Sequence, residues 1–189
     1  MIYVNFILDE SGSMYIVEKE TVKSINSYVK ELSQNKNAKD IRFSLVRFNG
    51  NKVEVYYDKA KLKNVKEISD YSPNGSTPLY DAIGDTISNV PENATESVLV
   101  VLTDGEENSS HEHTFESIIK LIENKKELGW KFVFLATGLT EVNRAVVYAA
   151  GVNLNFNTTY SGVQDSKGIC SVMNSAVLDT MNYVDSTAS

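Results

Sequence analysis

The chain has 189 residues, enough for one domain with a substantial buried core. Hydrophobic residues make up 42% of it and charged residues 23%, which is the balance of a folded globular protein rather than a disordered or fibrous one. The formal net charge is -7 at pH 7, so the field of the molecule repels nucleic acid phosphate and anionic membrane surfaces. We therefore expect a single domain over residues 1–189 that binds neither nucleic acid nor membranes.

Three features of the sequence bear on the cellular location. Cys170 is the only cysteine, so no disulfide can form within the chain, and a reducing compartment is expected. The first residues lack the basic segment and the small-residue cleavage site of a signal peptide. No apolar run reaches the ~18 residues that a membrane span requires. These features predict a cytoplasmic protein, while its oligomeric state stays open.

Two kinds of segment alternate along the chain, each with the hydrophobic spacing of one type of secondary structure. Short runs rich in β-branched and aromatic residues predict strands at residues 2–8, 41–48, 53–57, 97–103, 131–136 and 152–156. Apolar residues spaced by three and four predict helices at residues 16–33, 78–88, 115–128, 141–149 and 169–184. Strands that alternate with helices imply crossover connections and a mostly parallel sheet.

Two local signals refine this arrangement. The pair Asn49-Gly50 is a strong two-residue hairpin signal, so the strands on either side of it should form an antiparallel edge pair. Thr77 precedes Pro78, which suits the first helical position, so Thr77 is expected to be an N-cap. We therefore expect a doubly wound α/β fold, with a mostly parallel sheet, one antiparallel edge strand and helices on both faces.

Oxygen-bearing side chains gather at the positions where such a fold binds ligands, outside the carboxyl ends of its strands. Asp9, Ser11 and Ser13 follow the first strand, Thr77 precedes a helix, and Asp104 follows the strongly buried strand at 97–103. Carboxylates and hydroxyls are hard oxygen donors, which Mg²⁺ and Mn²⁺ prefer, and these three segments contain no histidine or cysteine to attract zinc. The sequence therefore predicts a site for Mg²⁺, with Mn²⁺ or Ca²⁺ as substitutes.

The charge of these side chains predicts what the cation would bind. Two carboxylates just balance a dication, while the three hydroxyls add oxygen dipoles without further negative charge. The cation therefore stays electrophilic, and an anionic oxygen from outside is the strongest replacement for a coordinated water. An aspartate or glutamate carboxylate of a partner protein has that chemistry. Gly12, between the two serines, permits the tight turn that would aim both hydroxyls at one point.

At these positions the sequence resembles the von Willebrand factor A-type (vWA) domain. The metal-ion-dependent adhesion site (MIDAS) of that family has the pattern Asp-x-Ser-x-Ser, then a distant Thr, then a distant Asp. Matching residues are Asp9, Ser11, Ser13, Thr77 and Asp104. The surrounding phrases Asp-Glu-Ser-Gly-Ser-Met, Ser-Thr-Pro-Leu-Tyr-Asp-Ala-Ile and Leu-Thr-Asp-Gly also look like those of bacterial members. The resemblance covers essentially the whole chain in the right order.

This resemblance implies a Rossmann-like fold and a role in protein–protein interaction. It also implies that Ser11, Ser13 and Thr77 touch the metal directly, while Asp9 and Asp104 act largely through water or by holding the serines. The domain would be a free-standing module of bacterial or phage type. One specific version is an adaptor for an AAA-type ATPase, which would be a separate polypeptide because this chain has no Gly-x-x-x-x-Gly-Lys motif.

Other functions compete with metal-dependent binding. A Mg²⁺-dependent phosphohydrolase of the haloacid dehalogenase type also places aspartates at strand ends, but its Asp-x-Asp motif is broken here by Ser11. No histidine or lysine lies in the three segments to serve as a general base, so we expect no enzymatic activity. In a third alternative the metal only stabilises the fold. Taken singly, the aspartates and serines could also be ordinary helix caps.

Further polar residues near these segments have two interpretations each. Asp81 and Asp85, four residues apart on a helix, could support the site from behind, although a solvated helix face is the simpler interpretation. His111 and His113 could form a second metal site, although a mobile acidic loop is favoured over it. We expect this loop to border the metal face because it follows Asp104.

Overall fold

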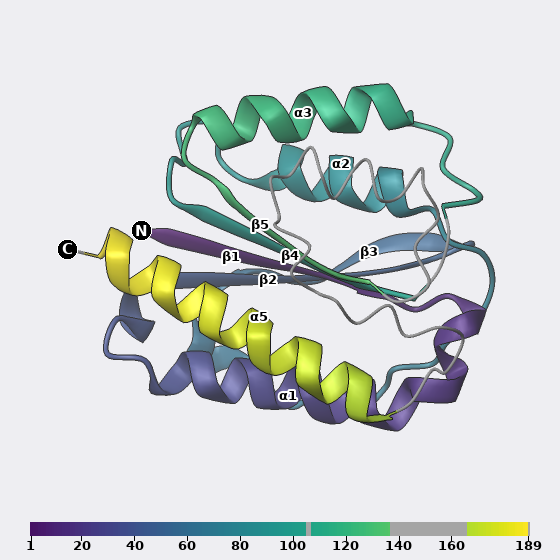
Figure 1. Ribbon diagram of the computed structural model, residues 1–189, viewed down its shortest axis with the longest axis horizontal. Coiled ribbons are helices and arrows are strands. Elements are labelled where there is room, and N and C mark those ends of the chain that lie inside the picture. The colour runs from purple at the N-terminus through teal and green to yellow at the C-terminus, as the bar shows by residue number, and fades with distance from the viewer. Residues whose placement is uncertain (105–106, 137–165, 189) are drawn as a thin grey trace.

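The computed structural model describes residues 1–104, 107–136 and 166–188. In this part a central sheet lies between two layers of helices (Figure 1). Its strands are β1 (Ile2–Asp9), β2 (Ile41–Asn49), β3 (Lys52–Ala60), β4 (Ser97–Thr103) and β5 (Lys131–Ala136). The α-helices are α1 (Glu18–Gln34), α2 (Leu79–Asn89), α3 (Phe115–Glu127) and α5 (Ser166–Thr187). Short 3-10 helices are η1 (Gly12–Val17), η2 (Ala38–Asp40) and η3 (Leu62–Asn64).

The strand order is β3-β2-β1-β4-β5, which places β1 at the centre. Strand β1 pairs in parallel with β2 on one side and with β4 on the other, and β5 extends the parallel part beyond β4. Only the edge pair is antiparallel in the described sheet, where β2 and β3 form the hairpin that Asn49-Gly50 predicts. The α/β fold with a mostly parallel sheet and one antiparallel edge strand is therefore confirmed.

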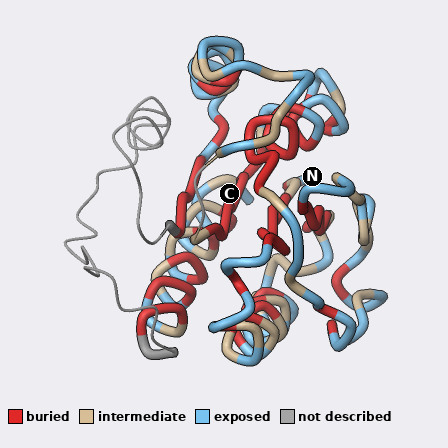
Figure 2. Tube along the Cα trace, turned by 90° about the vertical axis from the view of Figure 1, so that its right-hand side faces the viewer, coloured by how far each residue is buried: buried red, intermediate tan, exposed pale blue. Residues whose placement is uncertain are grey.

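Helices cover both faces of the sheet, with α2 and α3 on one side and α1 and α5 on the other (Figure 1). Alternation along β1 explains the two layers, since successive side chains of a strand point to opposite faces. Phe6 and Leu8 join the core that includes α1 and α5, whereas Ile7 joins the core that includes α2 and α3. The buried parallel strands therefore occupy the middle of the molecule, and the α-helices carry both buried and exposed residues (Figure 2).

Some boundaries differ from those that the sequence predicts. The first helix was expected at residues 16–33, but η1 comes first and α1 begins at Glu18. Helix α5 extends over Ser166–Thr187, beyond the expected 169–184. The helix expected at 141–149 and the strand expected at 152–156 lie outside the described residues. Within those residues, no helix is long and apolar enough to cross a membrane.

A buried hydrogen bond fastens α5 to α1. The Tyr28 hydroxyl lies 2.9 Å from Thr180 Oγ1, and both residues are fully buried. Burial also raises the pKa of Tyr28 well above its ordinary value, so the hydroxyl keeps its proton at every physiological pH and can donate or accept in this bond.

We expect Tyr28→Phe to lower the free energy of unfolding by about 1 kcal/mol, because it removes one buried hydrogen bond but keeps the aromatic ring. Urea denaturation measures the change. The matched control is Tyr15→Phe, since Tyr15 is 70% exposed and should shift the midpoint very little. Equal shifts for the two variants would contradict a role of this bond in docking α5.

Candidate metal site at the ends of β1 and β4

The candidate site lies where the order of the strands reverses. Strand β1 is followed in the chain by its neighbour β2, while its other neighbour, β4, comes much later. In such sheets the two chain directions diverge at this point and leave room for a ligand beyond the strand ends. Asp9 is the last residue of β1 and Asp104 directly follows the last residue of β4. The fold therefore brings these two aspartates to the same edge of the sheet.

The Asp9 carboxylate holds the strand ends together. Its Oδ1 accepts a hydrogen bond of 2.7 Å from the backbone N–H of Ser11, and its Oδ2 accepts one of 2.5 Å from the hydroxyl of Thr103. Asp9 is fully buried. The first bond sets the turn of the loop after β1, and the second ties that turn to β4.

A chain of oxygen atoms runs from this turn to Asp104. The hydroxyl oxygens of Ser11 and Ser13 are 3.2 Å apart, and the Ser13 hydroxyl donates a 2.7 Å hydrogen bond to Asp104 Oδ1. Ser11 is buried, whereas Ser13 is exposed and Asp104 is half-buried. Four of the five predicted site residues therefore form one cluster that is accessible from outside.

Thr77 joins this cluster through backbone bonds. The N–H of Gly12 donates to the carbonyl of Gly75 at 3.0 Å, which fastens the loop before Thr77 to the loop of residues 10–13, called the serine loop below. On the other side, the Thr77 N–H donates to Asn108 Oδ1 at 2.8 Å and the Thr77 carbonyl accepts from the Asn108 N–H at 3.1 Å. Thr77 is thus held between the serine loop and the segment that follows β4.

The expectation that Thr77 caps helix α2 is wrong. The helix begins at Leu79, and Pro78 occupies the N-cap position without a side-chain cap. Its first backbone donors are satisfied from a distant loop: Tyr80 N–H donates to Glu107 Oε2 at 2.9 Å, and Asp81 N–H donates to the Ser110 hydroxyl at 3.1 Å. The Glu107 carboxylate is also favoured by the positive end of the helix dipole.

Asp81 is not on a solvated helix face, contrary to the simpler expectation. It is buried, and its carboxylate accepts three hydrogen bonds of 2.8–3.0 Å, from the backbone N–H groups of residues 111, 112 and 113. Asp85 is exposed, as expected. The expected mobile loop is therefore fastened to α2, and Gly84 provides the space: a Cβ there would lie 2.3 Å from His113 Nε2.

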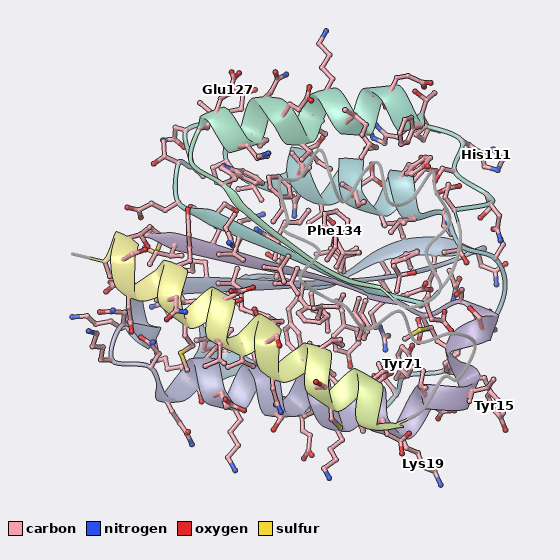
Figure 3. All side chains as sticks on the ribbon, viewed as in Figure 1. Tyr15, Lys19, Tyr71, His111, Glu127 and Phe134 are labelled. Carbon is pink, nitrogen blue, oxygen red and sulfur yellow. The ribbon has the colours of Figure 1, made fainter. Side chains whose placement is uncertain are left out.

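The histidines of this loop do not form a metal cluster with the acidic residues. His113 Nε2 lies 3.8 Å from Asp85, and His111 is exposed and points outward at the end of the molecule that also carries Tyr15 (Figure 3). Among the described residues, no group of three or more His, Cys, Asp or Glu side chains could hold a metal. A cation at this end would therefore depend on hydroxyl oxygens together with the two carboxylates.

Burial raises the pKa of both carboxylates. Desolvation raises the pKa of Asp9 from 3.8 to about 6, although hydrogen bonds from Thr103 and Ser11 offset part of this rise. It also raises the pKa of Asp104, against a hydrogen bond from Ser13. In the described part of the chain, no Lys, Arg or His forms an ion pair with Asp9. One buried and one half-buried carboxylate beside two hydroxyls are a donor set that fits a hard divalent cation.

The chain belongs to the von Willebrand factor type A domain family, whose model matches residues 4–169. Domains of this family typically bind other proteins. No curated protein matches the chain. Its fold is shared with several solved structures of low sequence identity, which show the architecture alone.

One of these structures is the SpRpn10 VWA domain, with a TM-score of 0.63 and 12% identity over 93% of this chain and 95% of that one. The pilus adhesin SpaC from Lactobacillus rhamnosus GG has a TM-score of 0.66 and 9% identity. Proximal thread matrix protein 1 from the mussel byssus has a TM-score of 0.62 and 13% identity. The match covers 95% and 93% of this chain but only 30% of the adhesin chain and 46% of the byssus chain.

The raised pKa of Asp9 predicts how the metal-free protein responds to pH. Asp9 titrates near 3.8 in the unfolded chain and near 6 in the folded one, so the folded state holds this proton more tightly. Its contribution to stability is present below pH 4 and is lost as the pH rises through 6. The difference corresponds to about 3 kcal/mol as an upper bound.

We therefore expect Asp9→Asn, in the presence of EDTA, to gain stability relative to the wild type between pH 4 and pH 7. Urea unfolding at both pH values gives the difference. Glu92→Gln is the control, because Glu92 is exposed and its removal should leave the pH dependence unchanged. A constant difference between Asp9→Asn and the wild type would contradict the perturbed titration.

The three hydrogen bonds to Asp81 predict a second outcome. Asp81→Ala should lower the free energy of unfolding by about 3 kcal/mol, because it leaves three backbone donors without their charged acceptor. Hydrogen exchange of the amides of residues 111–113 should accelerate as well. Asp85→Ala is the matched control one helical turn away, with an expected loss below about 1 kcal/mol. Unchanged exchange in Asp81→Ala would show that other contacts hold this loop.

Proposed function

We propose that this chain is a Mg²⁺-dependent protein-binding module whose metal completes its coordination with an Asp or Glu carboxylate of a partner protein. The observation that carries the proposal is the continuous set of oxygen atoms from Ser11 through Ser13 to Asp104, next to the buried carboxylate of Asp9. Mn²⁺ and Ca²⁺ are chemically suitable substitutes.

In this proposal Ser11, Ser13 and Thr77 hold the ion directly. Asp9 and Asp104 hold the serines in place, as their hydrogen bonds to Ser11 and Ser13 indicate, and complete the shell through water. Two carboxylates balance the charge of the ion, so the complex remains attractive to one more anionic oxygen. Ser13 and Asp104 are accessible, which leaves room for a partner's carboxylate to approach from outside.

We also propose that the module acts by binding rather than by catalysis. His113 lies against α2, where its Nε2 is 3.8 Å from Asp85, and this supports a role in docking the loop rather than in proton transfer. An adaptor for a separate AAA-type ATPase in the cytoplasm is a narrower version of the same proposal.

Titration calorimetry with Mg²⁺ tests the ion site. We expect saturable binding by the wild type and at least a tenfold loss of affinity in Ser13→Ala and Asp9→Ala, because each removes a ligand or the group that holds one. Ser88→Ala, an exposed serine on α2, is the control and should bind like the wild type. Absence of cation uptake by the folded wild type would refute the metal site.

Partner binding is tested by capture from a host lysate with the wild type and Asp9→Ala, each in Mg²⁺ and in EDTA. A partner of this site is retained only by the wild type in Mg²⁺, and changing its contacting Asp or Glu to the amide abolishes retention. Partners kept in EDTA would contradict metal-dependent binding. Metal-dependent melting without any such partner would indicate a purely structural ion, and Mg²⁺-dependent phosphoester turnover would indicate an enzyme.

A further inference from the structure

A buried ion pair connects the serine loop to β2. Glu10 occupies the variable position between Asp9 and Ser11, yet only 3% of it is exposed, and Arg47 near the end of β2 is 4% exposed. Arg47 Nη1 lies 3.7 Å from Glu10 Oε1. Taking two charges out of water costs free energy that a pair of apolar side chains would avoid, so stability alone is a weak reason for this pair.

Both members of the pair hold the segment 70–75, which leads to Thr77. Arg47 Nη1 donates to Asp70 Oδ1 at 3.2 Å and to the Asp70 carbonyl at 3.4 Å. Glu10 Oε1 accepts from the Ser72 N–H at 2.8 Å. The ring of Tyr56 supports the guanidinium at 4.1 Å, and its hydroxyl donates to Asp70 Oδ1 at 2.9 Å.

Backbone bonds continue the same attachment toward the site. The Asn74 N–H donates to the Glu10 carbonyl at 2.8 Å, and the Gly75 carbonyl accepts from the Gly12 N–H at 3.0 Å. The buried hydroxyl of Tyr71 donates to the carbonyl of Asp9 at 2.5 Å. Residues 65–78 contain no helix or strand, so these bonds, together with the core packing of Ile68 and Tyr71, hold the segment in place relative to the serine loop.

We propose that Glu10 and Arg47 are positioning residues. They hold the loop of residues 70–78, called the Thr77 loop, against the serine loop in the arrangement that binds the cation. This inference rests on the proposed metal site, because it assumes that oxygen atoms from both loops share one ion. A cation site tolerates small displacements of its ligands poorly, so loosening segment 70–75 should weaken metal binding even when the domain stays folded.

The charge of Arg47 provides a sharp test, since positioning and simple electrostatics predict opposite signs. Removing a positive charge near a cation site should strengthen cation binding electrostatically. We expect instead that Arg47→Met weakens Mg²⁺ binding at least tenfold in calorimetry. Arg42→Met is the matched control, because Arg42 lies at the other end of β2 and donates to the nearby carbonyls of Lys39 and Ile41. Its affinity should stay within twofold of the wild type.

The double variant Glu10→Met with Arg47→Met keeps the test valid if the single variant fails to fold, because replacing both charges by apolar side chains preserves folding more readily than breaking the pair. We expect it to melt cooperatively and to bind Mg²⁺ at least tenfold more weakly.

In Glu10→Gln, which keeps an acceptor for Ser72, the Mg²⁺ affinity should stay within threefold of the wild type, whereas Glu10→Ala should lose at least tenfold. Two results would overturn the positioning role. One is a Mg²⁺ affinity of the double variant equal to that of the wild type, and the other is an equal loss of affinity in Glu10→Gln and Glu10→Ala.

A metal-free measurement separates this inference from the proposed function. If the wild type takes up no Mg²⁺, the proposed function fails, and hydrogen exchange of the Gly12 and Asn74 amides still tests the attachment. These amides should exchange at least tenfold faster in the double variant than in the wild type or in Arg42→Met. Equal exchange rates in all three proteins would overturn the inference.

Discussion

The buried carboxylate of Asp9 is the group on which the rest of the site depends. One of its oxygens sets the turn of the serine loop, and the other joins β1 to β4 through the Thr103 hydroxyl. Burial makes the charged form of this carboxylate costly, and its hydrogen bonds offset only part of that cost. Such strongly perturbed groups are concentrated at functional sites, because a bound ligand can supply what the protein alone does not.

Two segments without regular secondary structure hold the loop that carries Thr77. Segment 70–75 is fastened to the serine loop through Glu10, and segment 107–113 is fastened to α2 through Glu107 and Asp81. Both rely on carboxylates that accept backbone N–H groups, which are strong, directional bonds for chain segments lacking regular hydrogen bonding. The described segments around the candidate site are therefore held by specific hydrogen bonds although they lack regular secondary structure.

Much of the fold could be predicted from the sequence because the sheet is buried on both faces. Strand β4 is uncharged throughout, and all seven of its residues are buried, so its sequence alone is typical of a central parallel strand. The site residues Asp9, Ser11, Ser13 and Asp104 could be predicted to meet because strand ends of a parallel sheet share one edge. Prediction succeeds at these residues because the local sequence places them after a strand and the fold brings the strand ends together.

The errors arise where partners are distant in sequence. Thr77 satisfies the local rule for a helix cap, but the donors of α2 are taken by Glu107 and Ser110, about thirty positions later. Asp81 has the spacing of a solvated face, yet it is buried and accepts backbone N–H groups from segment 111–113. Glu10 looked like a variable position of the motif, since nothing local announces its pairing with Arg47 on another strand. No local pattern contains this information.

Gly84 shows how such long-range contacts restrict the chemistry of a helix. Replacing a glycine inside a helix by alanine ordinarily adds up to about 1 kcal/mol of stability. Here the absent methyl group leaves room for the His113 imidazole, whose ring atoms would lie 2.3–2.5 Å from an added Cβ. The helix therefore accepts a more flexible backbone in exchange for contact with a neighbouring loop. Alanine at this position would have to displace the His113 ring, so the usual gain from replacing a helical glycine is opposed by the docking of the loop.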